Sequence, residues 1–208
     1  MNKNRLEAFS DGVFAIVITL LVLEIRPDLS VTGGWAMFRH ALPHILIYAL
    51  SFVMVGLYWV AHHNMLHFVA RIDRGFLWWN LLLLLVVAFI PFPAALLGAT
   101  GADAGALRVY CATLALTNVL GTILWAHATR GRRLAQAGLP GGFARFVVRL
   151  HLVPVLFYAV AAAVAGPWRW LSLVLIALVP AFYVLPNPFI DRRVREAQAA
   201  VDAARRER

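Results

Sequence analysis

Charged residues are scarce in this sequence: they make up 14% of its 208 residues, whereas hydrophobic residues make up 62%. This balance excludes an ordinary soluble protein and indicates an all-α integral membrane protein. The single cysteine, Cys111, excludes an intrachain disulfide and is interpreted as a small core residue. The arginines lie in short loops beside apolar runs, so their predicted partner is the lipid bilayer and not a nucleic acid.

Signatures of enzyme chemistry are also missing. The sequence has no P-loop, nucleophile elbow or dinucleotide fingerprint, so we predict neither an enzyme nor a cofactor. His63 and His67 are four residues apart with His62 beside them, which is ligand spacing for zinc or iron. A di-iron membrane enzyme needs several such groups, and this chain has one. Polar packing near the lipid headgroups is the favoured interpretation, with no metal site.

Apolar runs long enough to cross about 30 Å of hydrocarbon recur along the chain. We predict six spans, at 8–25, 42–66, 76–98, 106–128, 146–165 and 168–186. Prolines in the third, fifth and sixth spans predict kinks or early helix ends. Residues 1–187 are therefore predicted to form one six-helix transmembrane domain. The basic segment 188–208 is predicted to be either a short cytoplasmic helix or a frayed tail.

Arginine and lysine assign the two sides of the membrane. They concentrate before the first span, between the second and third, between the fourth and fifth, and after the sixth. The three opposite connections carry only Arg26, Arg39, Arg108 and Arg169. The positive-inside rule then places both termini of this multi-pass protein in the cytoplasm.

Polar residues mark the start of the first predicted span: Arg5 precedes it, and Ser10 and Asp11 lie near its beginning. Because lipid tolerates such groups poorly, we expect this helix to face protein or water. One interpretation is a scaffold in which the charges neutralise each other near the cytoplasmic interface. The other is a helix N-cap with its acid in the first turn. The two interpretations are compatible.

Deeper in this span, Ile16, Leu20 and Leu23 fall at helical spacing on one face, with Thr19 beside them. On most spans such a stripe is a packing face. If several copies met around an axis, the stripe would instead form apolar rings. Glu24, at the far end, would then add an acidic ring that concentrates cations, or it is a solvated residue that pairs with Arg26.

The first span carries a family resemblance. The start of the chain combines Arg5, the motif Phe9-Ser10-Asp11, a T-L-L-V-L run from Thr19 to Leu23 and the acid Glu24. This combination resembles the first-helix signature of the lysosomal potassium channel family, the transmembrane protein 175 family, in its short prokaryotic form. Residues 58–93 are similar to the family's second-to-third helix connection. The resemblance implies a six-span subunit in a bacterial-type inner membrane. It also implies that four subunits form a homotetramer around a central pore lined by the first helix, through which potassium ions pass passively.

The resemblance also implies roles for single residues. Ile16, Leu20 and Leu23 match the narrow part of the family's pore, and Thr19 supplies the only side-chain oxygen there. Because an aliphatic ring has no oxygens to replace an ion's water, and a TVGYG filter is absent, selectivity is expected to be modest and closure to occur by dewetting, as a hydrophobic gate.

In the family, the polar entry of the first helix takes part in a hydrogen-bond network. The resemblance therefore implies that Arg5, Ser10 and Asp11 hold this helix against its neighbours. The partners we predict are His62 or His63, and Asn80 or Trp79, all near the same membrane side.

The main alternative function is a secondary transporter or proton-coupled cation exchanger. Such proteins often have inverted repeats and ionisable groups at the bilayer midplane. This sequence has no evident repeat, and Asp11 lies too near the cytoplasmic end to be a midplane site. An accessory structural membrane protein would leave the first-helix motif unexplained. The predicted function is therefore a modestly selective, passive potassium channel.

Overall fold

The computed structural model describes residues 2–25 and 28–207. Arg26, a possible partner of Glu24, lies outside these residues, and so does the side chain of Arg132. The helices are α1 (Lys3–Val22), α2 (Gly34–His67), α3 (Arg74–Phe89), α4 (Pro91–Ala99), α5 (Ala104–Thr129), the 3-10 turn η1 (Arg130–Arg132), α6 (Gly141–Val164), α7 (Arg169–Val184) and α8 (Pro188–Arg206).

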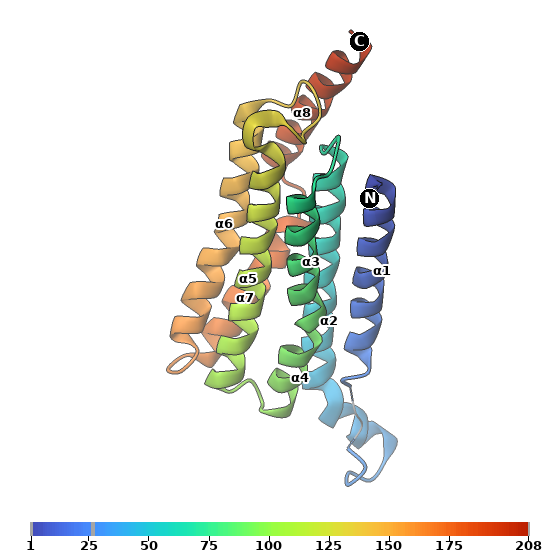
Figure 1. Cartoon of the computed structure of the whole chain (residues 1–208). Coiled ribbons are helices and arrows are strands. Elements are labelled where there is room, and N and C mark those ends of the chain that lie inside the picture. The colour runs from blue at the N-terminus through green and yellow to red at the C-terminus, as the bar shows by residue number, and fades with distance from the viewer. Residues whose placement is uncertain (1, 26–27, 208) are drawn as a thin grey trace.

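The helices form one elongated bundle, with α1 at one edge, α6 at the other, and α7 crossing behind α5 (Figure 1). Helix α1 packs against α2, α3 and α4, whereas α5 packs mainly against α6. The N-terminus, the α2–α3 and α5–α6 connections and α8 all lie at one end of the bundle (Figure 1). The α1–α2, α4–α5 and α6–α7 connections lie at the other end.

Each predicted span corresponds to a helix or a helix pair. The second predicted span, 42–66, lies within α2, which begins eight residues earlier, at Gly34. Its first turns extend beyond the rest of the bundle (Figure 1). The third predicted span, 76–98, is divided between α3 and α4 at Ile90. The basic segment that follows the last span is helical, as α8.

Length and composition support some of these spans directly. In the part of the chain that the structure describes, α2, α3 with α4, α5 and α6 are long and apolar enough to cross a membrane. Helix α1 has 20 residues but carries Arg5, Glu7 and Asp11 near its start. Helix α7 has 16 residues and is bent by 49° relative to α8. The first and last predicted spans therefore depend on evidence other than length and hydropathy.

The prolines act on the helices in two ways. Pro91 has no N–H to donate to the Val87 carbonyl, and the Ile90 N–H donates to it instead at 3.1 Å, which tightens the chain between α3 and α4. Pro154 in α6 likewise leaves the Leu150 carbonyl without its helical partner. The Tyr183 hydroxyl of α7 donates to that carbonyl at 2.8 Å, so α6 continues past its proline.

The two connections at the N-terminal end are tied together. Val69 and Ala135 form an isolated antiparallel bridge. Asp73 caps α3, and His127 of α5 lies 2.9 Å from the same carboxylate. The hydrogen bond from the Phe76 amide lowers the pKa of Asp73, and the contact with His127 adds to this effect. This end of the bundle is thus held by main-chain and polar contacts as well as by packing.

Helix α8 approaches the α5–α6 connection at Gly138. A Cβ at this glycine would lie 2.6 Å from the Ala200 carbonyl oxygen and 2.7 Å from the Ala204 Cβ, and its φ is +81°. Alanine is disfavoured at such a φ by about 1–2 kcal/mol before any clash is counted. Only glycine therefore fits under α8 at this position.

We expect Gly138→Ala to loosen α8. The C-terminal peptides should be released by trypsin roughly tenfold faster than from the unchanged protein, as measured by mass spectrometry of the purified protein. Gly142→Ala is the matched control, because a Cβ there meets nothing within 4 Å. Equal release from the two variants would mean that this close approach does not hold α8.

Candidate pore-lining helix

Helix α1 has two distinct faces. One face is buried against the neighbouring helices and consists of Leu6, Ser10, Phe14, Val17 and Leu21. These residues recur every three or four positions, which is the repeat of an α-helix that packs on one side. The packing partners are α2, α3 and α4. The apolar members of this face hold α1 at the edge of the bundle.

A second, exposed face of α1 carries the predicted pore residues. Ile16 is 60% exposed, Leu20 is 42% exposed and Leu23 is 63% exposed. Thr19 is also exposed, and its hydroxyl donates to the Ile16 carbonyl at 2.8 Å. Because that bond uses the hydroxyl hydrogen, the lone pairs of the oxygen remain free to meet a cation or water. The stripe thus points away from its own subunit.

A hydrogen-bonded chain joins α1 to α2 and α3 inside the bundle. The Asn80 side chain of α3 donates to the Ser10 hydroxyl at 3.1 Å. Its carbonyl oxygen lies 2.7 Å from Nε2 of His62 on α2. All three residues are at least 96% buried. Since buried polar groups are costly to leave unpaired, this chain fixes the positions of three helices relative to one another.

Asp11 is held by a residue that sequence reasoning missed. Trp59 of α2 donates its indole N–H to the Asp11 carboxylate at 2.8 Å. Trp59 is 48 residues away from Asp11 in the sequence, so no local pattern links the two residues. The one available signal was that Trp59 lies one helical turn before His63, a predicted partner of the first helix. The Trp59 and His63 rings lie 6.0 Å apart. Ser10 and Asp11 therefore attach α1 to two different neighbours.

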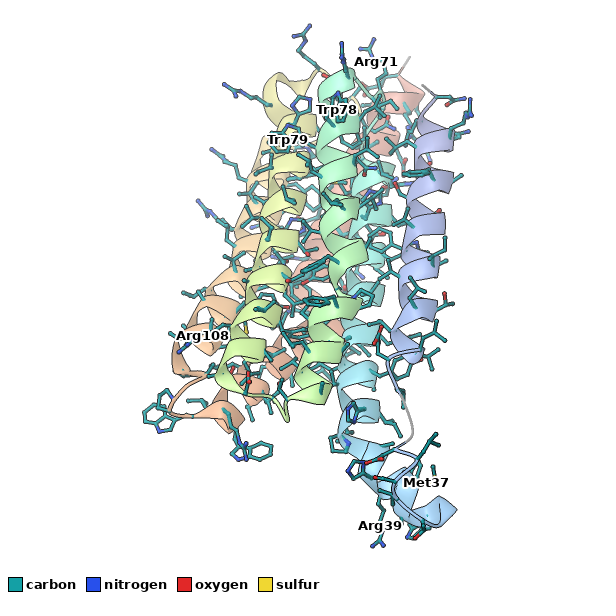
Figure 2. The ribbon with its side chains drawn as sticks, turned by 60° about the horizontal axis from the view of Figure 1, so that its bottom comes forward. Met37, Arg39, Arg71, Trp78, Trp79 and Arg108 are labelled. Carbon is teal, nitrogen blue, oxygen red and sulfur yellow. The ribbon has the colours of Figure 1, made fainter. Side chains whose placement is uncertain are left out.

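Other predicted members of the network lie apart from it. Arg5 and His63 are exposed and make no side-chain hydrogen bond to the described residues. Trp79 is half-buried next to Asn80, near the same end of the bundle as Arg71 (Figure 2). The structure thus brings together Ser10, Asn80 and His62, and separately Asp11 and Trp59.

Glu24 lies near the far end of α1. It is half-buried and lines a small pocket with His44 of α2 and Gly98 of α4. The His44 ring occupies the space that a Cβ on Gly98 would fill, with Cδ2 2.5 Å from that position. Glu24 is therefore next to the predicted stripe, beyond Leu23 at the end opposite Ser10. Within residues 2–25 and 28–207, no cluster of three or more His, Cys, Asp or Glu side chains suited to a metal ion was found.

Comparison with known proteins gives consistent matches. The model of the family described as endosomal/lysosomal potassium channel TMEM175 matches residues 5–91. The potassium channel B446_29190 of Streptomyces collinus is 36% identical over 96% of this chain and 99% of its own length. The potassium channel HX13_20290 of a Chryseobacterium species is 30% identical over 94% of this chain and 100% of its own length. The likeness thus extends along nearly the whole chain.

A solved structure has a similar fold. It is the crystal structure of a lysosomal potassium-selective channel TMEM175 homolog from Chamaesiphon minutus. It matches with a TM-score of 0.76 and 33% sequence identity, over 88% of this chain and 96% of that chain. The match therefore covers most of this chain and not the first helices alone.

Proposed function

Since the chain belongs to the endosomal/lysosomal potassium channel family TMEM175, we propose that it conducts potassium ions passively across a membrane. The observation that carries this proposal is the likeness to bacterial relatives named potassium channels over almost the full length of both chains. Passive conduction transforms no substrate and needs no cofactor, so we propose neither an enzymatic activity nor a cofactor. The permeant potassium ion is the partner that the function requires.

We further propose that the pore forms between subunits. In the arrangement that the resemblance implies, each chain lines the pore with one helix, α1, and a single helix cannot enclose a path for ions. A closed symmetric ring of identical chains can enclose one. The fourfold ring implied by the resemblance would bring the stripes of Ile16, Leu20 and Leu23 to one axis. The position of α1 at the edge of the bundle supports this arrangement (Figure 1).

The exposed stripe is the constriction that we propose. Stacked rings of Ile16, Leu20 and Leu23 supply no oxygens, so potassium ions pass only when the rings are wide enough to be wet. The Thr19 hydroxyl supplies the side-chain oxygen next to these rings, and its lone pairs are free. Such a pore discriminates between potassium and sodium modestly and closes when water leaves it. Glu24 would concentrate cations at the outer mouth.

The distribution of arginine supports an orientation. Arg71 lies at the end of the bundle where the N-terminus is found, whereas Arg39 and Arg108 lie toward the other end (Figure 2). The N-terminal end also holds the basic α5–α6 connection and α8. By the positive-inside rule we propose that both termini are cytoplasmic, with six spans in a bacterial-type inner membrane.

Potassium flux through the purified protein tests this function. Reconstituted in liposomes, the protein should release potassium down its gradient with no counter-ion gradient supplied, and faster than it releases sodium. Empty liposomes prepared in the same way are the control. If potassium moves only when a gradient of protons or another cation is supplied, the chain is an exchanger and the proposal fails.

A further inference from the structure

Three arginines lie near one another where α8 packs on α6. Arg145 and Arg149 are exposed and four residues apart on α6, so their side chains share one face. Arg193 of α8 is also exposed, and its guanidinium carbon lies 6.0 Å from the centre of the Phe146 ring and 5.5 Å from that of Phe189. Helix α8 thus adds a third positive charge to this face of α6.

The aromatic rings keep the third charge in place. The rings of Phe146 and Phe189 pack with their centres 5.7 Å apart. A guanidinium over two such rings is held by cation–π attraction. Phe146 directly follows Arg145 and comes three residues before Arg149, so Arg193 is brought within about one helical turn of both.

These three arginines have no carboxylate partner among the described residues. Two other arginines of α8 are paired, Arg192 with Glu196 at 3.6 Å and Arg205 with Asp202 at 4.0 Å. Asp191, in the first turn of α8, is exposed and makes no ion pair within 4.0 Å in the described part of the chain. Three neighbouring like charges repel one another, and an anion between them relieves this repulsion.

An exposed apolar stripe follows Arg145 and Arg149 along α6. Leu152 is 48% exposed, Leu156 is 65% exposed and Val160 is 43% exposed. All three follow Arg149 along the same face of α6, away from the end of the bundle where α8 lies. Arg149 is eight residues into α6, or about 12 Å along its axis, so its long side chain can reach back toward Arg145 while its stem lies on apolar surface.

We propose that Arg145, Arg149 and Arg193 bind the phosphate of an anionic membrane lipid, whose acyl chain lies along Leu152, Leu156 and Val160. A guanidinium binds phosphate oxygens in a bidentate manner, and three of them select a headgroup with net negative charge over a zwitterionic one. The lipid joins α8 to α6 and lies on the leaflet at the N-terminal end of the bundle. This site is separate from the pore, and its binding does not require ion conduction.

The test measures how tightly the purified, full-length protein retains added lipid, by native mass spectrometry. The probes are phosphatidylglycerol, which is anionic, and phosphatidylcholine, which is zwitterionic. The unchanged protein should prefer phosphatidylglycerol. Each arginine near a membrane surface contributes about fivefold in affinity, so Arg145→Gln/Arg149→Gln should weaken phosphatidylglycerol binding by roughly 25-fold.

The matched control is Arg195→Gln/Arg206→Gln, which removes the same charge from exposed positions of α8 that make no described ion pair. We expect this control to change the affinity by less than about twofold. Equal losses in the two double variants would show a general charge effect and overturn the site. Equal retention of the two lipids by the unchanged protein would also overturn it.

Two further measurements cover the remaining outcomes. If inorganic phosphate at millimolar concentration releases the phosphatidylglycerol, the site binds free anions and the lipid proposal fails. If the α6 double variant does not fold, the single variant Arg193→Gln tests the lipid site, because Arg193 is exposed on α8 and its replacement should not prevent folding. It should weaken phosphatidylglycerol binding by about fivefold, and unchanged binding would overturn the proposal.

Discussion

Leu23→Ala and Ile16→Ala are each expected to lower the preference for potassium over sodium toward one and to raise the total cation flux. Each substitution removes aliphatic carbons from an exposed position of the stripe, where Leu23 is 63% and Ile16 is 60% exposed. In the proposed ring every subunit loses these carbons at once, so the constriction becomes wider and holds water more readily. The measurement is potassium and sodium flux from liposomes that contain the purified variants.

Leu178→Ala is the matched control for these variants. Leu178 is 47% exposed, slightly more than Leu20, but it lies on α7, which packs mainly against α6. Its loss should leave both fluxes unchanged. If the ion preference of Leu23→Ala and Ile16→Ala equals that of the unchanged protein, these residues do not form the constriction. The channel function would still stand if potassium flux persisted.

Asn80→Leu is expected to destabilise the subunit severely. It leaves the Ser10 hydroxyl and Nε2 of His62 without the partner that each has in the buried chain. An unpaired buried polar group costs about 1–3 kcal/mol, so the two together should cost about 2–6 kcal/mol. For a protein of this size, the midpoint of thermal unfolding in detergent should fall by roughly 6–18 °C.

Asn64→Leu is the comparison for this variant, because Asn64 is exposed on α2 and makes no described side-chain hydrogen bond. Its midpoint should stay within about 2 °C of the unchanged protein. The unfolding midpoint of Ser10→Ala should lie between those of Asn80→Leu and Asn64→Leu. This substitution removes one acceptor and leaves the bond between Asn80 and His62 in place. An Asn80→Leu midpoint equal to that of Asn64→Leu would mean that the chain does not stabilise α1.

The helices could be located from the sequence because lipid imposes long apolar runs. The break near Pro91 also followed from a local rule, since proline cannot donate a main-chain hydrogen bond. The start of α2 at Gly34 did not follow. The residues from Gly34 to Ala41 are too mixed in polarity to resemble a span, yet they continue the helix beyond the bundle.

The polar contacts show the limit of reading a single sequence. The motif at Ser10 and Asp11 indicated that α1 needs polar partners, and Asn80 and His62 were among the candidates. Which histidine takes part is decided by the rotation of α2, which buries His62 and exposes His63. The bond from Trp59 to Asp11 joins residues 48 positions apart and depends on how α1 and α2 cross. No local pattern specifies that crossing.

The two anchors of α1 have a geometric consequence. Ser10 and Asp11 are adjacent, so they point about 100° apart around the helix, and they are bonded to α3 and α2 respectively. Together these two bonds fix the rotation of α1 about its own axis and its position along the bundle. A shift of one residue would turn Val17, Leu21 and the carboxylate of Glu24 toward the place now held by the aliphatic stripe. In the proposed pore, the two anchors would therefore determine which side chains of α1 face the ions.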